Sequence, residues 1–346
     1  MQRCLELALK GLGNVAPNPL VGAVLVKDGK IIGEGYHRQY GQPHAEVNAV
    51  KLFVDAPGND AVELSKAALY VNLEPCNHHG MTPPCTELII QYKIPEVVIG
   101  CADPNRKTKI SGMEALTKAG CKVMTGVLKN ESEELNRRFI TFHAKKRPYI
   151  ILKYAQSKDG FIAPEKNSGK ESWLTNQWSR KLVHKWRSEE PAIMVGTNTA
   201  ITDNPFLTTR FWTGKNPLRV VIDRRLRLPS LLNIFNADAP TLIFNESRNK
   251  SSSNIEFVKV NFENSIKEIL HSLYARQVQS VIVEGGARLL ESIIEKNLWD
   301  EARVFTADKY LVRGIGSPVL SAGQVSEEII EGDALAVFRN TSSAAL

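Results

Sequence analysis

The stretch Leu73-Glu-Pro-Cys-Asn-His-His-Gly-Met-Thr-Pro-Pro-Cys85, with Pro43-His-Ala-Glu46 upstream, decides how the first half of this chain is interpreted. One histidine and two cysteines, His44, Cys76 and Cys85, can supply three tetrahedral zinc ligands and leave the fourth position for water. Zinc lowers the pKa of such a water toward neutrality, so that hydroxide becomes available. Glu46 lies two residues after His44 in the same predicted helix and can carry protons without binding the metal. The pattern therefore predicts a catalytic zinc site with one ion per chain.

This pattern is close to a known chemical signature but departs from it in one spacing. Zinc nucleobase deaminases carry His-x-Glu followed by Pro-Cys-x-x-Cys. Here eight residues separate the two cysteines where that signature has two. Two alternatives stay open at this point. The three side chains could be a buried histidine and two core thiols, or His78 or His79 could complete a closed structural zinc site.

Length and composition limit the class of protein. A chain of 346 residues suggests two domains, and 43% hydrophobic with 23% charged residues is average for a globular chain. This composition excludes a disordered protein, a collagen and a coiled coil. There is no apolar run of about 20 residues and no apolar signal-peptide core. The net charge of +7 fits phosphorylated small molecules at least as well as nucleic acid.

Strands alternate with helices along the whole chain, which predicts an α/β fold with two three-layer domains. We place the boundary near 143–148, with domains at 1–143 and 148–340. In the first domain the patterns predict strands at 20–26, 31–36, 67–73 and 97–101 and helices at 45–54, 86–92, 112–119 and 131–142. In the second they predict strands at 149–155, 192–195, 219–222, 241–244 and 280–283 and helices at 177–188, 265–276 and 287–296.

The pair Gly285-Gly286 between a predicted strand and a predicted helix suggests a phosphate-binding turn. Glycines let the backbone approach an anion, and the first helical amides and the helix dipole attract it. A plain tight turn would give the same pattern. No Gly-x-Gly-x-x-Gly follows a strand, which disfavours an ordinary Rossmann domain.

Nearly the whole chain resembles the family of bifunctional deaminase–reductases of riboflavin biosynthesis. In the first half the resemblance rests on the stretch 73–85 and on Ala16-Pro-Asn-Pro-Leu-Val-Gly22, Val26-Lys-Asp-Gly29, Gly33-Glu-Gly-Tyr-His37 and Pro43-His-Ala-Glu-Val47. In the second half it rests on Lys153-Tyr-Ala-Gln-Ser-Lys-Asp-Gly160, Trp173-Leu-Thr175, Gly196-Thr-Asn-Thr199, Asp203-Asn-Pro205, Val221-Ile-Asp223 and Glu284-Gly-Gly-Ala287. It implies a cytidine-deaminase-like N-terminal domain and a dihydrofolate-reductase-like C-terminal domain.

The resemblance implies two activities. The first domain would use zinc to hydrolyse an amino group from 2,5-diamino-6-ribosylamino-4(3H)-pyrimidinone 5′-phosphate. The second would use NADPH to reduce 5-amino-6-ribosylaminouracil 5′-phosphate to the ribitylamino product. We further expect a cytoplasmic homo-oligomer, a dimer or a tetramer, that takes phosphorylated pyrimidines and uses neither nucleic acid nor a membrane as partner.

Individual roles follow from the same resemblance. His44, Cys76 and Cys85 would bind zinc, and Glu46 would be the catalytic proton shuttle. Residues expected to contact the pyrimidine substrate in the first domain are Asn18, His37, His78, Asp103 and Asn105. Residues expected to contact NADPH are Gln156, Trp173, Thr199, Asp203, Arg224, Gly285, Gly286, Ala287, Arg288, Leu289 and Leu290. Residues expected to contact the substrate of the reductase are Arg187, Leu207, Arg210 and Glu284.

The chain also departs from the family. Arg224 stands where the family commonly has Ser or Thr near the 2′-phosphate of NADPH, and an arginine suits that phosphate. Lys158 replaces a usual apolar residue, and the loop 106–111 differs from the family pattern. Two other functions are alternatives. A nucleic-acid base deaminase needs an aromatic-lined basic groove, yet aromatics are only 7% and the second half stays unexplained. A deaminase with an inactive reductase half would fail to bind NADPH.

Overall fold

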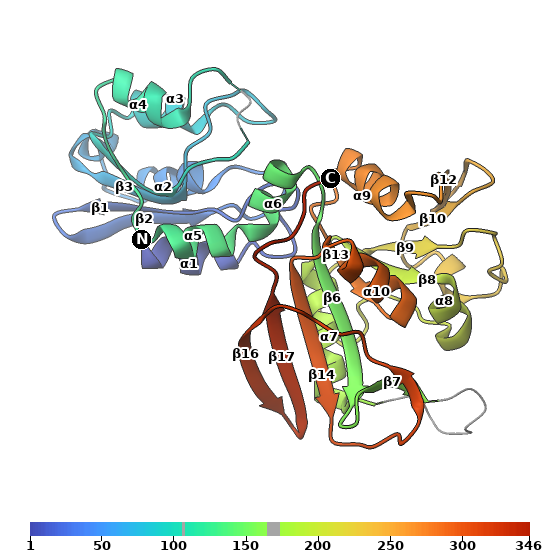
Figure 1. Cartoon of the computed structure of the whole chain (residues 1–346). Coiled ribbons are helices and arrows are strands. Elements are labelled where there is room, and N and C mark those ends of the chain that lie inside the picture. The colour runs from blue at the N-terminus through green and yellow to red at the C-terminus, as the bar shows by residue number, and fades with distance from the viewer. Residues whose placement is uncertain (106–107, 165–173) are drawn as a thin grey trace. The chain divides into compact units, whose positions relative to one another are not determined.

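The computed structural model describes residues 1–105, 108–164 and 174–346. The chain divides into two compact units, Met1–Ala144 and Lys145–Leu346 (Figure 1). Trp173, expected to contact NADPH, lies outside the described residues, as does part of the unusual loop, 106–107. No helix in the described ranges has the length and apolar character needed to cross a membrane.

The first unit is built on one sheet with the order β2-β1-β3-β4-β5. A hairpin forms one side of it, and three parallel strands form the other. The hairpin strands are antiparallel to each other, and β1 also pairs antiparallel with β3. The strands are β1 (Gly22–Lys27), β2 (Lys30–Tyr36), β3 (Ala68–Leu73), β4 (Glu96–Cys101) and β5 (Lys122–Thr125).

Helices cover both faces of this sheet because its strands alternate apolar side chains between the two faces. In β1, Ala23 and Leu25 pack with α2, α3 and α4, whereas Val24 packs with α1 on the other face. Leu135 of α5 joins a smaller cluster with α1. The helices are α1 (Gln2–Leu9), α2 (Ala45–Val54), α3 (Cys85–Gln91), α4 (Gly112–Lys118), α5 (Lys129–Leu135) and α6 (Arg137–Lys145), with a 3-10 turn at Ala61–Lys66.

A close contact with strand β2 sets the position of α2, whose N-cap is His44 and whose first turn carries Glu46. A Cβ on Gly35 of β2 would lie 2.5 Å from the Ala49 nitrogen, so only glycine lets α2 pack this closely on the strand.

The expected single helix at 131–142 is wrong, because it is divided at Asn136 into α5 and α6. The buried Asn136 side chain bonds both backbone groups of Leu20 instead of facing solvent.

The second unit contains a long mixed sheet with the order β11-β12-β10-β9-β8-β13-β6-β14-β17-β16 in the described ranges. The strands from β12 to β14 run parallel, and the outer strands are antiparallel. The parallel strands are β6 (Tyr149–Ser157), β8 (Ala192–Gly196), β9 (Leu218–Ile222), β10 (Thr241–Asn245), β12 (Ile255–Lys259), β13 (Ser280–Glu284) and β14 (Glu301–Ala307). The others are β11 (Lys250–Ser252), β16 (Gly323–Ile330) and β17 (Asp333–Arg339), with β7 (Phe161–Pro164) and β15 (Gly314–Gly316) in a small separate sheet.

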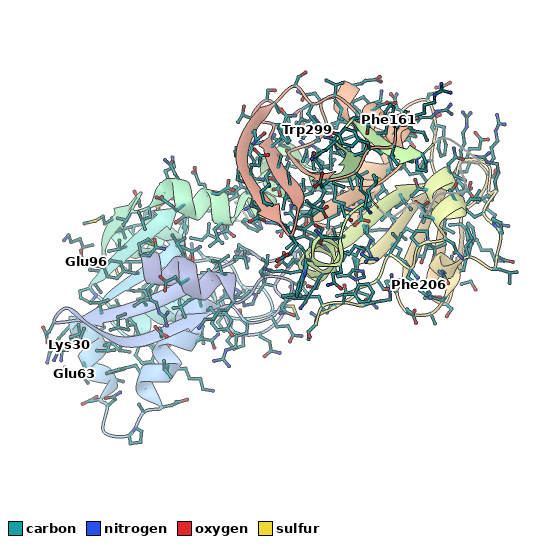
Figure 2. All side chains as sticks on the ribbon, turned by 90° about the horizontal axis from the view of Figure 1, so that it is seen from below. Lys30, Glu63, Glu96, Phe161, Phe206 and Trp299 are labelled. Atoms are coloured by element: carbon teal, nitrogen blue, oxygen red, sulfur yellow. The ribbon has the colours of Figure 1, made fainter. Side chains whose placement is uncertain are left out.

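This sheet also has a core on each face. One core joins α9 (Ser265–Ala275) and α10 (Ala287–Glu295) to the sheet and includes the buried Trp299 (Figure 2). The other joins α7 (Gln177–Glu189) and α8 (Thr197–Asp203) to the opposite face, beside a 3-10 turn at Asn233–Phe235. The carboxyl ends of the parallel strands therefore meet at one edge between two helical layers, where α/β sheets bind ligands.

Candidate functional sites

Three side chains from separate elements meet after strand β3. His44 immediately precedes α2, Cys76 follows β3, and Cys85 begins α3. The His44 Nδ1 atom lies 3.5 Å from Sγ of Cys76 and 3.3 Å from Sγ of Cys85. Bonds of about 2.0 Å to nitrogen and 2.3 Å to sulphur at a tetrahedral angle separate the two ligand atoms by about 3.5 Å. The spacing of these side chains therefore fits a zinc ion, with Nδ1 as the histidine ligand atom.

The protonation of the two cysteines also suits a cation. The Cys85 thiol and the His44 ring lower the pKa of Cys76 to about 4, and the Cys85 backbone N–H donates to Cys76 Sγ at 3.3 Å. The bond to Cys76, together with burial, raises the pKa of Cys85. Because the thiolate is the form that binds metal, the cluster holds one anionic ligand at neutral pH.

Within the described parts of the chain, the ligand cluster consists of His44, Cys76 and Cys85, whose ligand atoms lie within 4.8 Å of one another. His79 instead pairs with Glu87 at 3.0 Å and is largely exposed, and His78 does not join the cluster. The closed site with four protein ligands therefore has no support in this geometry, which leaves one position of a tetrahedron for another ligand.

Glu46 lies beside the cluster in the first turn of α2 and is only 3% exposed. Burial raises the pKa of its carboxyl group, and Cys85 interacts with it directly. A carboxyl group whose pKa moves toward neutrality can both take up and release a proton.

Asn18 and His37 form a fixed pair next to the zinc ligands. Burial lowers the pKa of His37, so its ring is neutral. Its Nδ1–H donates to the Pro43 carbonyl at 3.1 Å, and its Nε2 accepts from the Asn18 amide at 3.0 Å. The His37 ring centre lies 5.3 Å from that of His44. The side chain of Asn18 is thereby held near the metal ligands, as a substrate contact requires.

Asp103 and Asn105 follow the carboxyl end of β4, which is next to β3 in the sheet. Leu73 pairs in register with Cys101, so Asp103 and Cys76 follow the same sheet edge. The Asp103 carboxylate accepts from the Asn105 backbone N–H at 2.8 Å, which makes a tight turn. Contact of these two residues with substrate stays a prediction.

A second group of charged residues forms in the other unit between β6, β13 and α7. Lys153 and Glu284 pair in register on neighbouring strands and share the face that α7 covers. Arg187 of α7 donates to both oxygens of Glu284, at 2.8 and 3.3 Å. Although burial opposes ionisation, Arg187 and Lys153 lower the pKa of Glu284 to about 2. Burial also lowers the pKa of Lys153.

Sequence reasoning did not single out Lys153 as a site residue. The available signal was a lysine in the middle of an apolar strand, at Tyr149–Ser157. A cation at such a position needs a partner or a function, because burial of an unpaired charge is costly.

The loop after α8 brings a further arginine to this group. Arg187 Nη1 donates to the Thr208 carbonyl, and Arg210 Nη1 donates to the Thr208 hydroxyl. The Arg210 guanidinium stacks 4.6 Å from the ring centre of Phe206, labelled in Figure 2. Leu207 has a φ of +54° and buries its side chain in the core, so only its backbone can reach a substrate.

The glycine turn after β13 has the shape expected of a phosphate-binding turn. Gly285 and Gly286 have φ values of +80° and +73°. A Cβ on Gly285 would lie 3.0 Å from Thr199 Cγ2, and one on Gly286 would lie 3.1 Å from Thr199 Oγ1. A side chain at either glycine would therefore fill the space between the turn and the start of α8. This turn can hold an anionic group of a cofactor against the first amides of α10.

The side chains of the other residues expected to contact the cofactor differ in how far they are exposed to solvent. Leu290 is fully buried in the core and Leu289 packs against it, and their amides both donate to the Gly286 carbonyl. Asp203 and Arg288 are exposed, and Ala287 and Gln156 are half-buried. Gln156 donates to Thr306 across the sheet at 3.1 Å. Lys158, unexplained by sequence, forms an ion pair with Asp308 at 2.5 Å.

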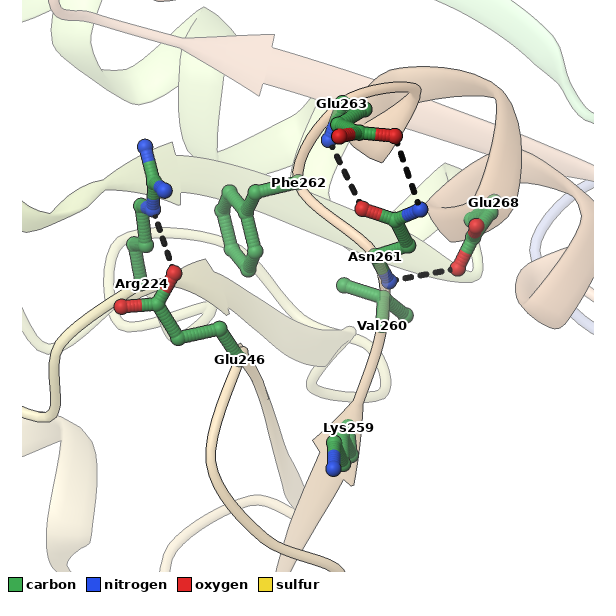
Figure 3. Close-up of a pocket in the computed structure, with 8 residues that line it drawn as sticks. All are labelled: Arg224, Glu246, Lys259, Val260, Asn261, Phe262, Glu263 and Glu268. Carbon is green, nitrogen blue, oxygen red and sulfur yellow. Dashed lines mark hydrogen bonds and ion pairs between the residues drawn. The ribbon is translucent and has the colours of Figure 1, made fainter.

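A cavity of about 560 Å³ opens at the carboxyl ends of β9, β10 and β12 (Figure 3). Arg224 Nε donates to Glu246 at 2.6 Å, and its guanidinium lies 5.5 Å from the ring centre of Phe262. The cavity is lined by Arg224, Glu246, Lys259, Val260, Asn261, Phe262, Glu263 and Glu268. It combines two cations, three carboxylates and an aromatic ring on the same edge of the sheet as the glycine turn.

Comparison with known proteins finds a family for each unit. Residues 1–101 match the zinc-binding region of cytidine and deoxycytidylate deaminases, and residues 148–327 match the RibD C-terminal domain. These matches confirm the predicted fold class of a deaminase-like unit followed by a reductase-like unit.

Whole-chain relatives extend this result. The chain is 39% identical over 337 residues to riboflavin biosynthesis protein RibD of Aquifex aeolicus, which covers 95% of this chain and 92% of that protein. It is 35% identical over 332 residues to RibD of Escherichia coli, with 90% and 87% covered. The crystal structure of a diaminohydroxyphosphoribosylaminopyrimidine deaminase/5-amino-6-(5-phosphoribosylamino)uracil reductase from Thermotoga maritima superposes with a TM-score of 0.89 at 38% identity, covering 98% of this chain and 97% of that one. The chain belongs to the family of riboflavin biosynthesis protein RibD.

Proposed function

We propose that this protein catalyses two successive steps of riboflavin biosynthesis. The first unit removes an amino group from 2,5-diamino-6-ribosylamino-4(3H)-pyrimidinone 5′-phosphate by zinc-dependent hydrolysis. The second reduces the resulting 5-amino-6-ribosylaminouracil 5′-phosphate with NADPH. The observation that carries the proposal is the presence, in one chain, of a three-ligand metal cluster beside a buried glutamate and of a cationic group beside a glycine turn.

In the first unit, His44, Cys76 and Cys85 hold the metal, which when bound supplies a water of lowered pKa. Glu46 accepts the proton of the attacking water and returns it to the departing amino group, so that ammonia leaves. Asn18, fixed by His37, donates or accepts hydrogen bonds at the pyrimidine edge. His78, Asp103 and Asn105 are proposed contacts for the rest of the substrate.

In the second unit, bound NADPH would supply the hydride that the reduction of the open sugar requires. Lys153 is the proposed proton donor to the sugar, because its lowered pKa makes it a better acid than an exposed lysine. Glu284 and Arg187 hold Lys153 and the substrate in place. With Lys153 and Arg210, this group carries three cations against one carboxylate, which suits a phosphate dianion.

The residues proposed to hold NADPH follow the sheet edge. Thr199 and the turn from Gly285 to Arg288 hold the pyrophosphate, and Leu289 and Leu290, whose amides donate to the Gly286 carbonyl, fix the shape of this turn. Gln156, Trp173 and Asp203 are further proposed contacts. Arg224 follows β9, two strands from β13 in the order β13-β8-β9, lines the cavity of Figure 3, and is proposed to bind the 2′-phosphate.

Two wider properties belong to the proposal. We propose a cytoplasmic protein, which is supported by five cysteines that are all free thiols. We also propose a homodimer or homotetramer. The outer strand β16 supports this, since Val325 and Ile329 are exposed there and an unpaired edge can associate with another chain.

A coupled assay tests the proposed function. Purified, zinc-loaded protein receives the diaminopyrimidine ribosyl phosphate and NADPH, and ammonia release and NADPH oxidation are followed together. We expect ammonia first and NADPH oxidation after it. Ammonia alone would show that the second unit is inactive, as in the second alternative above, and neither signal at one zinc per chain would overturn the proposal.

A further inference from the structure

His184 is a buried polar residue of α7 that none of the roles above uses. It is 5% exposed and lies one turn before Arg187 on the same helix. Its Nδ1 lies 2.9 Å from the backbone nitrogen of Arg210, and its ring lies edge-to-face with Phe211 at 4.7 Å between centres. His184 therefore joins α7 to the loop that presents Arg210.

This contact fixes the protonation of the imidazole ring. A backbone N–H can only donate, so Nδ1 must be the unprotonated acceptor and the single proton must lie on Nε2. The groups facing the ring reinforce this state. Burial and the charges of Arg187, Arg210 and Lys153 lower the pKa of His184 to about 4, and Glu284 only partly opposes them. At neutral pH His184 is a neutral donor through Nε2–H.

Among the residues that the structure describes, the Nε2–H group donates to no protein acceptor, and Nε2 is not one of the buried polar atoms without a partner, so this donor reaches the surface of the site. A neutral imidazole N–H at the surface of a site can donate to an acceptor atom of a bound ligand. The neighbours that act electrostatically on His184 are the same residues that give the site its excess of two positive charges. The ligand that suits both features is a phosphate monoester, which is an acceptor and carries close to two negative charges.

We propose that His184 is a substrate-binding residue of the reductase site, in which Nε2–H donates to the phosphate of the substrate while Nδ1 holds the Arg210 loop in position. The proposal rests on the proposed reductase function and adds to it a neutral donor between two arginines. A neutral donor adds a hydrogen bond without further repulsion between the cations of the site.

Two conservative variants separate the two halves of this role. In His184→Asn, the shorter amide reaches the position of Nδ1 and can keep the acceptor, but it loses the donor at Nε2. In His184→Gln, the longer amide can keep a donor near Nε2 but loses the acceptor for the Arg210 amide. His184→Leu removes both. His271→Asn, which changes an exposed histidine on the opposite face of the sheet, is the matched control.

The full-length enzyme is assayed for reductase kcat and KM with the phosphorylated substrate and with its dephosphorylated form, and for competitive inhibition by inorganic phosphate. Loss of a hydrogen bond to a charged group predicts that His184→Asn and His184→Leu raise KM and the inhibition constant of phosphate about tenfold or more. His184→Gln should raise both less, and His271→Asn should change neither. With the dephosphorylated substrate all four variants should match the wild type.

Equal KM values in all variants would overturn the proposal, as would an equal loss with the phosphorylated and dephosphorylated substrates, which would indicate only a packing role. Deaminase activity in the same samples shows that the first unit is intact. Failure of the proposed function is distinguishable, because the wild type itself would then not oxidise NADPH. Phosphate binding by the wild type and variants, measured calorimetrically, would in that case still test the His184 contact.

Discussion

The ion pair between Arg187 and Glu284 predicts a measurable loss of stability when the arginine is replaced. Arg187→Met keeps an unbranched apolar stem and removes the charge and the hydrogen-bond donors. The lowering of the Glu284 pKa from its ordinary 4.5 to about 2 corresponds to about 3 kcal/mol, at 1.36 kcal/mol per unit. Because Lys153 supplies part of this stabilisation, we expect the variant to lose about 2 kcal/mol of unfolding free energy at pH 7.

Tryptophan fluorescence during urea unfolding measures this loss in the correct unit, because all five tryptophans lie after residue 145, at 173, 178, 186, 212 and 299. The pKa of Glu284 is lowered in the folded state, so its contribution is complete above pH 4.5 and is lost as the pH falls through about 2. The difference between wild type and Arg187→Met should therefore shrink below pH 4.5. The double variant with Glu284→Gln should be more stable than Arg187→Met alone. A double variant that is less stable than the single one, or a difference that does not change with pH, would refute this reasoning.

Other changes test the metal and cofactor sites. Cys85→Ser should abolish stoichiometric zinc, measured by elemental analysis, while NADPH binding is retained; full zinc occupancy would contradict the ligand assignment. Gly285→Ala should weaken NADPH binding at least tenfold in a fluorescence titration. The added Cβ would contact Thr199, and alanine would have to adopt the positive φ of this position, which costs about 1–2 kcal/mol from the backbone alone. Arg224→Gln should reduce the affinity for NADPH about tenfold or more without changing that for NADH, because it removes a charged contact to the 2′-phosphate; an equal effect on both would place the 2′-phosphate elsewhere.

Much of the first unit could be predicted from sequence, since its helices and strands keep regular apolar periods. The predicted helix at 45–54 coincides with α2, and the hairpin of β1 and β2 lies where it was expected. Strand β5 was missed because its residues are mostly exposed at the sheet edge, and an exposed edge strand lacks the apolar alternation that identifies a strand.

The strands of the second unit were harder to predict from sequence, because several of them carry buried charged residues. In β14, Arg303 and Glu301 are almost fully buried and pair at 2.6 Å, so the strand reads as partly polar. Lys153 in β6 was overlooked for the same reason, since its partner Glu284 is 131 positions away in the chain. Strand β16 was missed for a different reason. Its residues are exposed along nearly its whole length, so it lacks an apolar pattern. A buried charge becomes interpretable only when the fold shows its partner.

Each unit carries out one step in the proposed function, and the Glu46→Gln variant separates the two steps. The zinc-loaded full-length variant is supplied with NADPH and either the diaminopyrimidine or the ribosylaminouracil phosphate, and both ammonia and NADPH are measured. We expect the variant to retain zinc and to oxidise NADPH at the wild-type rate with the uracil compound. With the diaminopyrimidine, it should release ammonia at least a hundredfold more slowly. Ammonia release at the wild-type rate, or loss of both activities in a folded, zinc-loaded protein, would contradict the account.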